Sequence, residues 1–230
     1  QVLVTNGKII GGEALVRWMH EGKLISPMRF VPILEKTGYI FQIDCNIWER
    51  VAKWLQDAQR RGIEPVPISV NVSRVDFYFA DIAEHFINLV NRYGLDPRMI
   101  GIEITESALT DNINTILKAI RRLRDAGFHV MMDDFGSGYS SLSMLKDLPV
   151  DVLKIDMEFL RETEHTEKSR IILSSIIEMS QKLGIDIITE GVESKAQMEH
   201  LQELGCYMYQ GYYFAKPISV AEFEAKYFGE

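Results

Sequence analysis

Two adjacent carboxylates, Asp133 and Asp134, lie in the segment VMMDDFGSGYSSL, where an apolar run meets a glycine-flanked loop. Neighbouring negative charges repel each other, so this pair needs a compensating partner, which could be solvent, a lysine or a metal ion. Adjacent aspartates suit two divalent ions roughly 3.5–4 Å apart, because one carboxylate can bridge both ions while its neighbour binds the second. Such a pair of ions activates water and clamps the attacking and leaving oxygens of a phosphodiester. The segment therefore indicates a two-metal site.

Polar side chains also end the other apolar runs of the chain. These runs are β-branched or apolar, are bounded by Gly, Pro or Asp, and predict buried strands over residues 8–15, 66–72, 100–105, 129–133, 150–156, 185–190 and 206–214. At or near their carboxyl ends lie, besides the two aspartates, Glu13, Asn71, Glu103, Lys154, Glu190 and Gln210. One polar strand end says little, whereas an unbroken series of them indicates a shared site.

Helical patterns alternate with these runs. Apolar side chains recur at helical spacing in residues 47–61, 113–124 and 171–183. Strand and helix in alternation predict a mostly parallel sheet covered by helices, and we expect an α/β fold of the TIM-like (β/α)8 barrel type, with a doubly wound open sheet as the weaker alternative. In a barrel the carboxyl ends of the strands converge on one face, where active sites lie. Only seven strands are visible, so one barrel strand is expected to be missing.

The donor set favours hard cations. Carboxylates with an amide oxygen, and without cysteine or histidine, select Mg²⁺ or Mn²⁺, and none of the five histidines ends a predicted strand. Ca²⁺ has a larger and looser coordination, so we expect it to inhibit. Lys154 would hold the nucleophilic water or a phosphate oxygen by its charge.

Each of these residues also has an ordinary structural interpretation. Lys154 could pair with a neighbouring acid, and Glu103 could be that acid within a layer of barrel side chains. Glu13 could be held by backbone amides, Asn71 could cap the following turn, and Gln210 could bond a loop. Together these interpretations require unrelated coincidences on one rim, so we favour the joint functional interpretation.

Composition excludes several classes of protein. The chain of 230 residues has 25 basic and 33 acidic side chains and a net charge of −8, which disfavours binding to a nucleic-acid polymer. No run reaches the roughly 18 apolar residues of a membrane span and no signal peptide is present, so we expect a cytoplasmic domain without membrane contact, although a longer parent could be membrane-anchored. Cys45 and Cys206 lie far apart and are interpreted as free thiols.

Seven ordered motifs resemble the motif series of EAL domains, which are cyclic di-GMP phosphodiesterases. They cover nearly the whole chain and read EALVRW (13–18), NVS (71–73), EITES (103–107), DDFGSGYSSL (133–142), KID (154–156), EGVE (190–193) and QGYYFAKP (210–217). The resemblance implies a barrel with an antiparallel first strand and the Mg²⁺- or Mn²⁺-dependent hydrolysis of cyclic di-GMP to linear 5′-pGpG. The family's first strand ends just before the place of Gln1, so this strand is the one expected to be missing. Residues 1–230 are thus interpreted as one N-terminally truncated EAL domain of a longer signalling protein.

The resemblance also implies a role for each matching residue. One metal ion would be held by Glu13, Asn71, Glu103 and Asp133, and the other would be held or faced by Asp133, Asp134 and Glu190. Lys154 would position the attacking water, and Glu190 would be either the general base or a metal-shell ligand. With Glu13, these two form the expected catalytic set. Substrate contacts are expected from Leu15, Arg17, Asn71, Asp156, Glu193, Gln210 and Tyr212, with Arg17 on a phosphate and Glu193 and Tyr212 near a guanine.

The same resemblance extends to assembly. Glu106 would anchor the DFGSGYSS loop, which borders the usual dimer interface, so a homodimer is expected. The family usually has Thr where this chain has Ser137, and both supply a hydroxyl group. Sensory or diguanylate cyclase domains could be covalently linked outside this chain.

Three functions compete at this point. The complete set of acids with Lys154 favours an active phosphodiesterase. The alternative is a catalytically inactive EAL domain that acts as a cyclic di-GMP sensor or protein-interaction module, but such members usually lose a metal ligand and none is lost here. The third is a barrel enzyme that acts on another phosphodiester.

Overall fold

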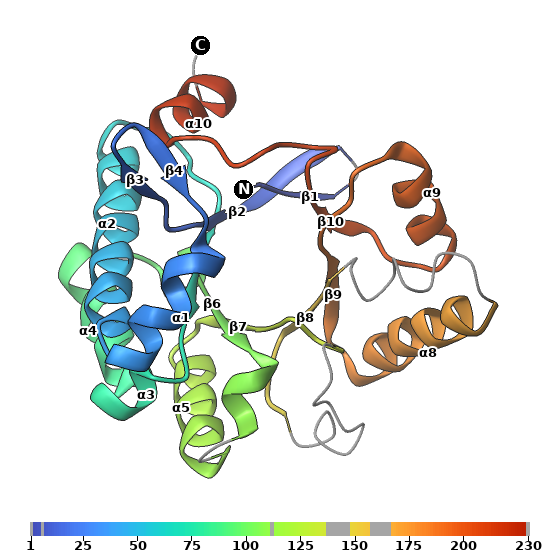
Figure 1. Ribbon diagram of the computed structural model, residues 1–230, viewed down its shortest axis with the longest axis horizontal. Coiled ribbons are helices and arrows are strands. Elements are labelled where there is room, and N and C mark those ends of the chain that lie inside the picture. The colour runs from blue at the N-terminus through green and yellow to red at the C-terminus, as the bar shows by residue number, and fades with distance from the viewer. Residues whose placement is uncertain (1, 6, 111–112, 137–147, 157–166, 229–230) are drawn as a thin grey trace. The chain divides into compact units, whose positions relative to one another are not determined.

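The computed structural model describes residues 2–5, 7–110, 113–136, 148–156 and 167–228 (Figure 1). The strands are β1 (Val2–Thr5), β2 (Lys8–Ala14), β3 (Trp18–His20), β4 (Lys23–Ile25), β5 (Ile68–Val72), β6 (Ile100–Thr105), β7 (His129–Asp133), β8 (Val152–Ile155), β9 (Asp186–Thr189) and β10 (Met208–Gln210). The helices are α1 (Pro27–Thr37), α2 (Ile40–Arg60), α3 (Asp76–Phe79), α4 (Ile82–Tyr93), α5 (Ile113–Asp125), α8 (Glu167–Leu183), α9 (Lys195–Glu203) and α10 (Val220–Tyr227), with 3₁₀ turns η1 (Pro97–Met99) and η2 (Glu106–Thr110).

Eight strands among the described residues follow the order of a closed barrel, β1-β10-β9-β8-β7-β6-β5-β2, while β3 and β4 form a separate two-stranded sheet. Strand β1 pairs antiparallel with both β10 and β2. The pairs β10–β9, β9–β8, β8–β7 and β5–β6 are all parallel. The predicted barrel with an antiparallel first strand is therefore confirmed.

The prediction that the first strand is missing is wrong. Residues Val2–Thr5 form β1, in which Leu3 lies opposite both Gln210 and Gly11. The sequence Asn-Gly at positions 6–7 is a common hairpin connection, and Gly7 has the positive φ of 74° that such a turn requires. A strand of four residues just before a turn is too short to be recognised from its apolar pattern, which explains the count of seven.

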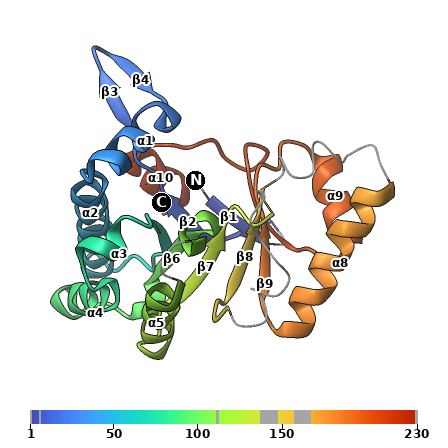
Figure 2. The same ribbon diagram turned by 60° about the horizontal axis from the view of Figure 1, so that its bottom comes forward.

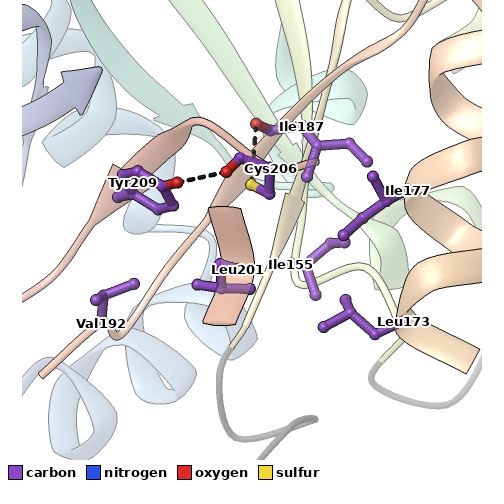
Figure 3. Packing of buried hydrophobic residues seen from close by; sticks show 8 residues of the cluster. All are labelled: Ile155, Leu173, Ile177, Ile187, Val192, Leu201, Cys206 and Tyr209. Carbon is purple, nitrogen blue, oxygen red and sulfur yellow. Dashed lines mark hydrogen bonds between the residues drawn. The ribbon is translucent and has the colours of Figure 1, made fainter. Parts of the chain in front are cut away.

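The chain divides into two compact units, unit 1 (residues 1–13 and 131–230) and unit 2 (residues 14–130), which are described separately. In unit 1, α8 and α9 pack on one side of the β8–β9–β10 strands (Figure 1). Figure 3 shows the core between them, in which Ile187 of β9 and Tyr209 of β10 pack with Ile177 of α8 and Leu201 of α9. Two members of this core, Ile155 and Tyr209, are direct neighbours in sequence of the predicted site residues Lys154 and Gln210.

In unit 2, helices α2 and α4 supply the aromatic centre of the core. Trp48 of α2 is fully buried, and its ring centre lies 4.7 Å from that of Phe86 on α4.

Figure 2 shows the β3–β4 hairpin projecting beyond α1 and α2. We did not predict this hairpin from the sequence. Because His20 ends β3, the expectation that no histidine ends a strand is wrong for the hairpin, although none of the described barrel strands ends in histidine. Within the described ranges we find no helix with the length and apolarity required to span a membrane.

Candidate active site

Lys154 lies among carboxylates in unit 1. Its side chain on β8 is 1% exposed, and its Nζ lies 2.8 Å from Oε1 of Glu190, 3.5 Å from Oδ1 of Asp133 and 3.8 Å from Oε2 of Glu13. Asp133 ends β7, Glu13 lies near the end of β2, and Glu190 directly follows β9. Strand ends that are far apart in the sequence therefore bring these four predicted residues together.

Gln210, the last residue of β10, joins two of these acids. Its Nε2 donates a hydrogen bond to Oε2 of Glu13 at 2.5 Å and another to Oε1 of Glu190 at 3.1 Å. A side-chain amide nitrogen carries two hydrogens, so it can donate both bonds at once. Gln210 is 4% exposed, and its side chain is therefore held by the site and contributes to the positions of both carboxylates.

Negative charge in this group exceeds what Lys154 can neutralise. Burial raises the pKa of Glu190 to about 9; the charge of Lys154 opposes this shift, and the charges of Asp133 and Glu13 add to it. Burial, followed by the charge of Asp133, raises the pKa of Asp134 to about 6. A bound cation would lower the pKa of both carboxyl groups, because it stabilises their ionised forms.

The backbone at Asp134 has an unusual conformation. Its φ is 56°, in the left-handed region, which among non-glycine residues is tolerated best by Asn and Asp. The N–H of Asp134 donates to Oδ1 of Asp133 at 2.9 Å, and the N–H of Phe135 donates to the carbonyl oxygen of Lys154 at 3.1 Å. The turn after β7 is thus tied to β8 at Lys154 itself.

The oxygen atoms of these carboxyl groups are suitable ligands for a metal cation. In this structure the carboxyl groups of Glu13, Asp133 and Glu190 lie around the ammonium group of Lys154. Within the part of the chain that the structure describes, no group of three or more Asp, Glu, His or Cys side chains is arranged to hold a metal ion. The donor set nevertheless consists of oxygens, which suits Mg²⁺ or Mn²⁺.

Asn71 and Glu103 are neighbours within unit 2. Strands β5 and β6 pair in parallel, with Asn71 opposite Glu103. Glu103 is 2% exposed, and the carbonyl oxygen of Asn71 accepts a hydrogen bond of 3.0 Å from Nε1 of Trp48. These two predicted ligands are therefore paired with each other on adjacent strands.

Glu106 is 1% exposed and begins η2, directly after β6. The loop that it was predicted to anchor continues into residues 137–142, which lie outside the described residues. The expectation for Ser137 falls there as well.

The residues predicted to contact a substrate differ in exposure, from the buried Gln210 to exposed side chains. In unit 1, Glu193 and Tyr212 are exposed and Asp156 is half-buried. In unit 2, Arg17 is exposed and Leu15 is half-buried. Such exposure is compatible with contact to a ligand that arrives from solvent.

A buried acid pair in unit 2 was not predicted. Asp44 of α2 and Asp76 of α3 are 7% and 0% exposed, and their carboxyl groups are hydrogen-bonded to each other. Burial raises the pKa of Asp44 to about 8 and that of Asp76 to about 7. A carboxylate has no hydrogen to donate, so one member of the pair must be protonated. The available signal was the place of Asp44 between Ile40 and Trp48 on the buried face of α2.

The chain matches a known family model and a curated protein. The model of the EAL domain matches residues 1–217. MucR of Pseudomonas aeruginosa, named a bifunctional diguanylate cyclase/cyclic di-GMP phosphodiesterase, is 37% identical over 219 residues, which cover 95% of this chain and 32% of that protein. The chain spans between 28% and 32% of the length of the first three curated relatives that it matches.

Solved structures give the same assignment. The phosphodiesterase of PaMucR in complex with c-di-GMP has a TM-score of 0.89 and 36% identity, with 97% of this chain and 92% of that chain covered. The manganese/cyclic di-GMP complex of Klebsiella pneumoniae BlrP1 has a TM-score of 0.75 and 25% identity, with 93% of this chain and 53% of that chain covered. From the match over residues 1–217, we conclude that the chain belongs to the EAL domain family.

Proposed function

We propose that this domain hydrolyses cyclic di-GMP to linear 5′-pGpG with the help of two divalent cations. The observation that carries the proposal is the arrangement of Lys154 with Glu13, Asp133 and Glu190 in unit 1. These residues occupy the acid and lysine positions of EAL motifs, in a chain whose relatives include named cyclic di-GMP phosphodiesterases.

We assign the predicted ligands to Mg²⁺ or Mn²⁺. Glu13, Asn71, Glu103 and Asp133 would hold one ion, and Asp133, Asp134 and Glu190 would hold the other. Bound ions would polarise the phosphodiester and lower the pKa of water. The manganese complex of the Klebsiella relative supports Mn²⁺ as the first cation to test, and Ca²⁺ is proposed to inhibit.

Lys154 and Glu190 would divide the work on the attacking water. The ammonium group of Lys154 can donate three hydrogen bonds and can hold either the water or a phosphate oxygen. Among the described contacts, Lys154 and Gln210 both use Oε1 of Glu190, so Oε2 can serve a cation or accept the proton of the water. Glu190 can therefore act as metal-shell ligand or as general base, and Gln210 keeps its carboxylate in place for either role.

The exposed residues would bind the nucleotide. The guanidinium group of Arg17 suits a substrate phosphate, since its fork of donors matches phosphate oxygens. Tyr212 offers a ring to stack on guanine and Glu193 offers a carboxylate to accept guanine N–H groups. The other proposed contacts are Leu15, Asn71, Asp156 and Gln210.

The proposal extends to the assembly of the protein. We place the domain in the cytoplasm as a homodimer, with Glu106 anchoring the loop beside the dimer interface. Because MucR is named a bifunctional enzyme and is about three times as long as the match, we propose that residues 1–230 are one domain of a longer signalling protein.

Turnover and binding should be measured side by side. The protein is incubated with cyclic di-GMP and Mn²⁺ and the formation of 5′-pGpG is followed by chromatography, while binding is measured by calorimetry in Ca²⁺, in which hydrolysis is expected to be inhibited. Formation of 5′-pGpG supports the proposal. Tight binding without turnover in Mn²⁺ would contradict it and indicate a sensor.

A further inference from the structure

The segments that carry Glu190 and Gln210 cross each other within unit 1. Strands β9 and β10 pair in parallel with Tyr209 opposite Thr189, so Glu190 and Gln210 follow side by side. Beyond the strands, the N–H of Val192 donates to the carbonyl oxygen of Gln210 at 3.2 Å, and the N–H of Tyr213 donates to the carbonyl oxygen of Val192 at 3.0 Å. The backbone of Val192 is thus bonded on both sides of Gly211.

Gly211, directly after β10, lies where the backbone comes closest to the backbone of Val192, in the segment after β9. A β-carbon at this position would overlap the amide nitrogen and carbonyl oxygen of Val192, and it would lie 2.8 Å from its carbonyl carbon. Gly211 is not among the glycines with positive φ, so the need for glycine here comes from space and not from backbone conformation. The atoms in the way belong to the backbone, which cannot rotate aside as a flexible side chain can.

The close approach bears directly on Glu190. The N–H of Glu190 donates to the carbonyl oxygen of Ile155 at 2.9 Å, so this residue is held to the end of β8 by its own backbone and to β10 through Val192. Its side chain then meets Lys154 and Gln210 at 2.8 and 3.1 Å. Any displacement of the backbone at Val192 would therefore be passed to a carboxylate only two residues away.

We propose that Gly211 is a positioning residue: its missing β-carbon lets the segment after β9 close onto β10 and so sets Glu190 against Gln210 and Lys154. The proposal rests on the proposed function in that Glu190 and Gln210 are taken to serve a metal-dependent reaction. Gly211 itself offers no side chain to a ligand, so it acts through these two residues.

The test compares Gly211→Ala with Gly205→Ala in the full chain. Gly205 precedes β10 and has a φ of 89°, and a β-carbon there would lie 3.2 Å from Nε2 of Gln181. The Gly205→Ala variant is therefore also strained, but its strain lies six residues before Gly211 and does not involve Val192. Mn²⁺ affinity is measured by calorimetry without nucleotide, unfolding by urea, and kcat and KM with cyclic di-GMP. We expect Gly211→Ala to weaken Mn²⁺ binding and lower kcat by about tenfold or more, with a smaller change in KM. Gly205→Ala should lose stability without losing Mn²⁺ affinity.

Unchanged Mn²⁺ affinity and kcat in a folded Gly211→Ala variant would overturn the proposal. If the variant does not fold, amide hydrogen exchange on the wild-type protein decides instead. Strong protection of the Val192 and Tyr213 amides supports the proposed close contact between the segment after β9 and the end of β10. Exchange of these amides at the rate of an unstructured chain would overturn the proposal. A wild-type protein that binds Mn²⁺ but does not hydrolyse cyclic di-GMP would contradict the proposed function alone, because the comparison of Mn²⁺ affinities still tests the role of Gly211.

Discussion

Lys154 and Glu190 form an ion pair in which Nζ lies 2.8 Å from Oε1, and the lysine side chain is only 1% exposed. Asp133 and Glu13 also lie within ion-pair distance of the same ammonium group, at 3.5 and 3.8 Å. One positive charge thus faces three carboxyl groups. Burial is the main cause of the raised pKa of Glu190, and the charges of Asp133 and Glu13 add to it. The excess of carboxyl groups over ammonium groups makes the site suitable for added cations.

Replacing Lys154 with Met should destabilise the metal-free protein. The change leaves buried carboxylates without their counter-charge, which typically costs about 3–5 kcal/mol when one partner of a buried pair is removed. Urea unfolding in the presence of a chelator measures the loss. The matched control is Lys182→Met on α8, whose pair with Glu178 has side chains 73% and 67% exposed. There we expect a much smaller loss, because both side chains are solvated, and equal losses in the two variants would contradict the assigned role of Lys154.

Replacing Gln210 with Ala should weaken the site without unfolding the domain. The variant loses the two hydrogen bonds that join Glu13 and Glu190, and groups that orient metal ligands typically change metal affinity or activity by about 10- to 100-fold. Mn²⁺ titration and kcat measure the effect. Gln181→Ala is a suitable control, because the Gln181 side chain bonds only a backbone oxygen at Gly205, at 3.0 Å, among its described hydrogen bonds. A Gln210→Ala variant that matched this control would contradict the role given to Gln210.

The buried pair of Asp44 and Asp76 predicts a loss of stability as pH rises. The pKa of Asp44 is raised from 3.8 to about 8 in the folded protein, so the folded state holds a proton that the unfolded state has released. Stability from this group is complete below about pH 4 and is lost progressively as pH rises to about 8. Between pH 5 and pH 8 we expect a loss of about 1–3 kcal/mol, measured by urea unfolding.

Asp44→Asn should remove much of this dependence. An amide can donate a hydrogen bond to Asp76 at every pH, so the variant should show a flatter profile and gain stability relative to the wild type above pH 8. The free energy of unfolding at pH 5.5 and pH 8.5 in both proteins provides the comparison. A variant as sensitive to pH as the wild type would show that other groups cause the effect.

Long apolar runs allowed much of the barrel to be predicted. The predicted ranges 100–105 and 129–133 coincide with β6 and β7, because each run is continuous and has clear boundaries. Helix α2 begins at Ile40 and not at residue 47, since Asp44 interrupts the apolar pattern of its first turns. Helix α4 was not predicted, although Asp81 caps its start by accepting the N–H of Glu84 and Gly94 follows its end. Asp81 and Gly94 are typical helix-capping residues, so the sequence contained a signal for α4 that the prediction did not use.

The sequence allowed us to predict which residues form the site, but not the distances between their side chains. The grouping of Glu13, Asp133, Lys154, Glu190 and Gln210 follows from their positions at strand ends, because parallel strands of a barrel bring these ends together. The distances depend on how buried side chains pack, which no spacing in the sequence specifies. The same holds for the two buried aspartates of unit 2, which come from separate helices.

The most direct test of the account is turnover of cyclic di-GMP by the wild-type protein and by Glu13→Ala and Asp133→Asn, with Mn²⁺ present and 5′-pGpG measured by chromatography. Circular dichroism and urea unfolding verify that the variants remain folded. We expect turnover by the wild type, loss of turnover on chelation, and no detectable turnover by either variant. Hydrolysis by a variant at the wild-type rate, or no hydrolysis by the folded wild type with Mn²⁺, would contradict it.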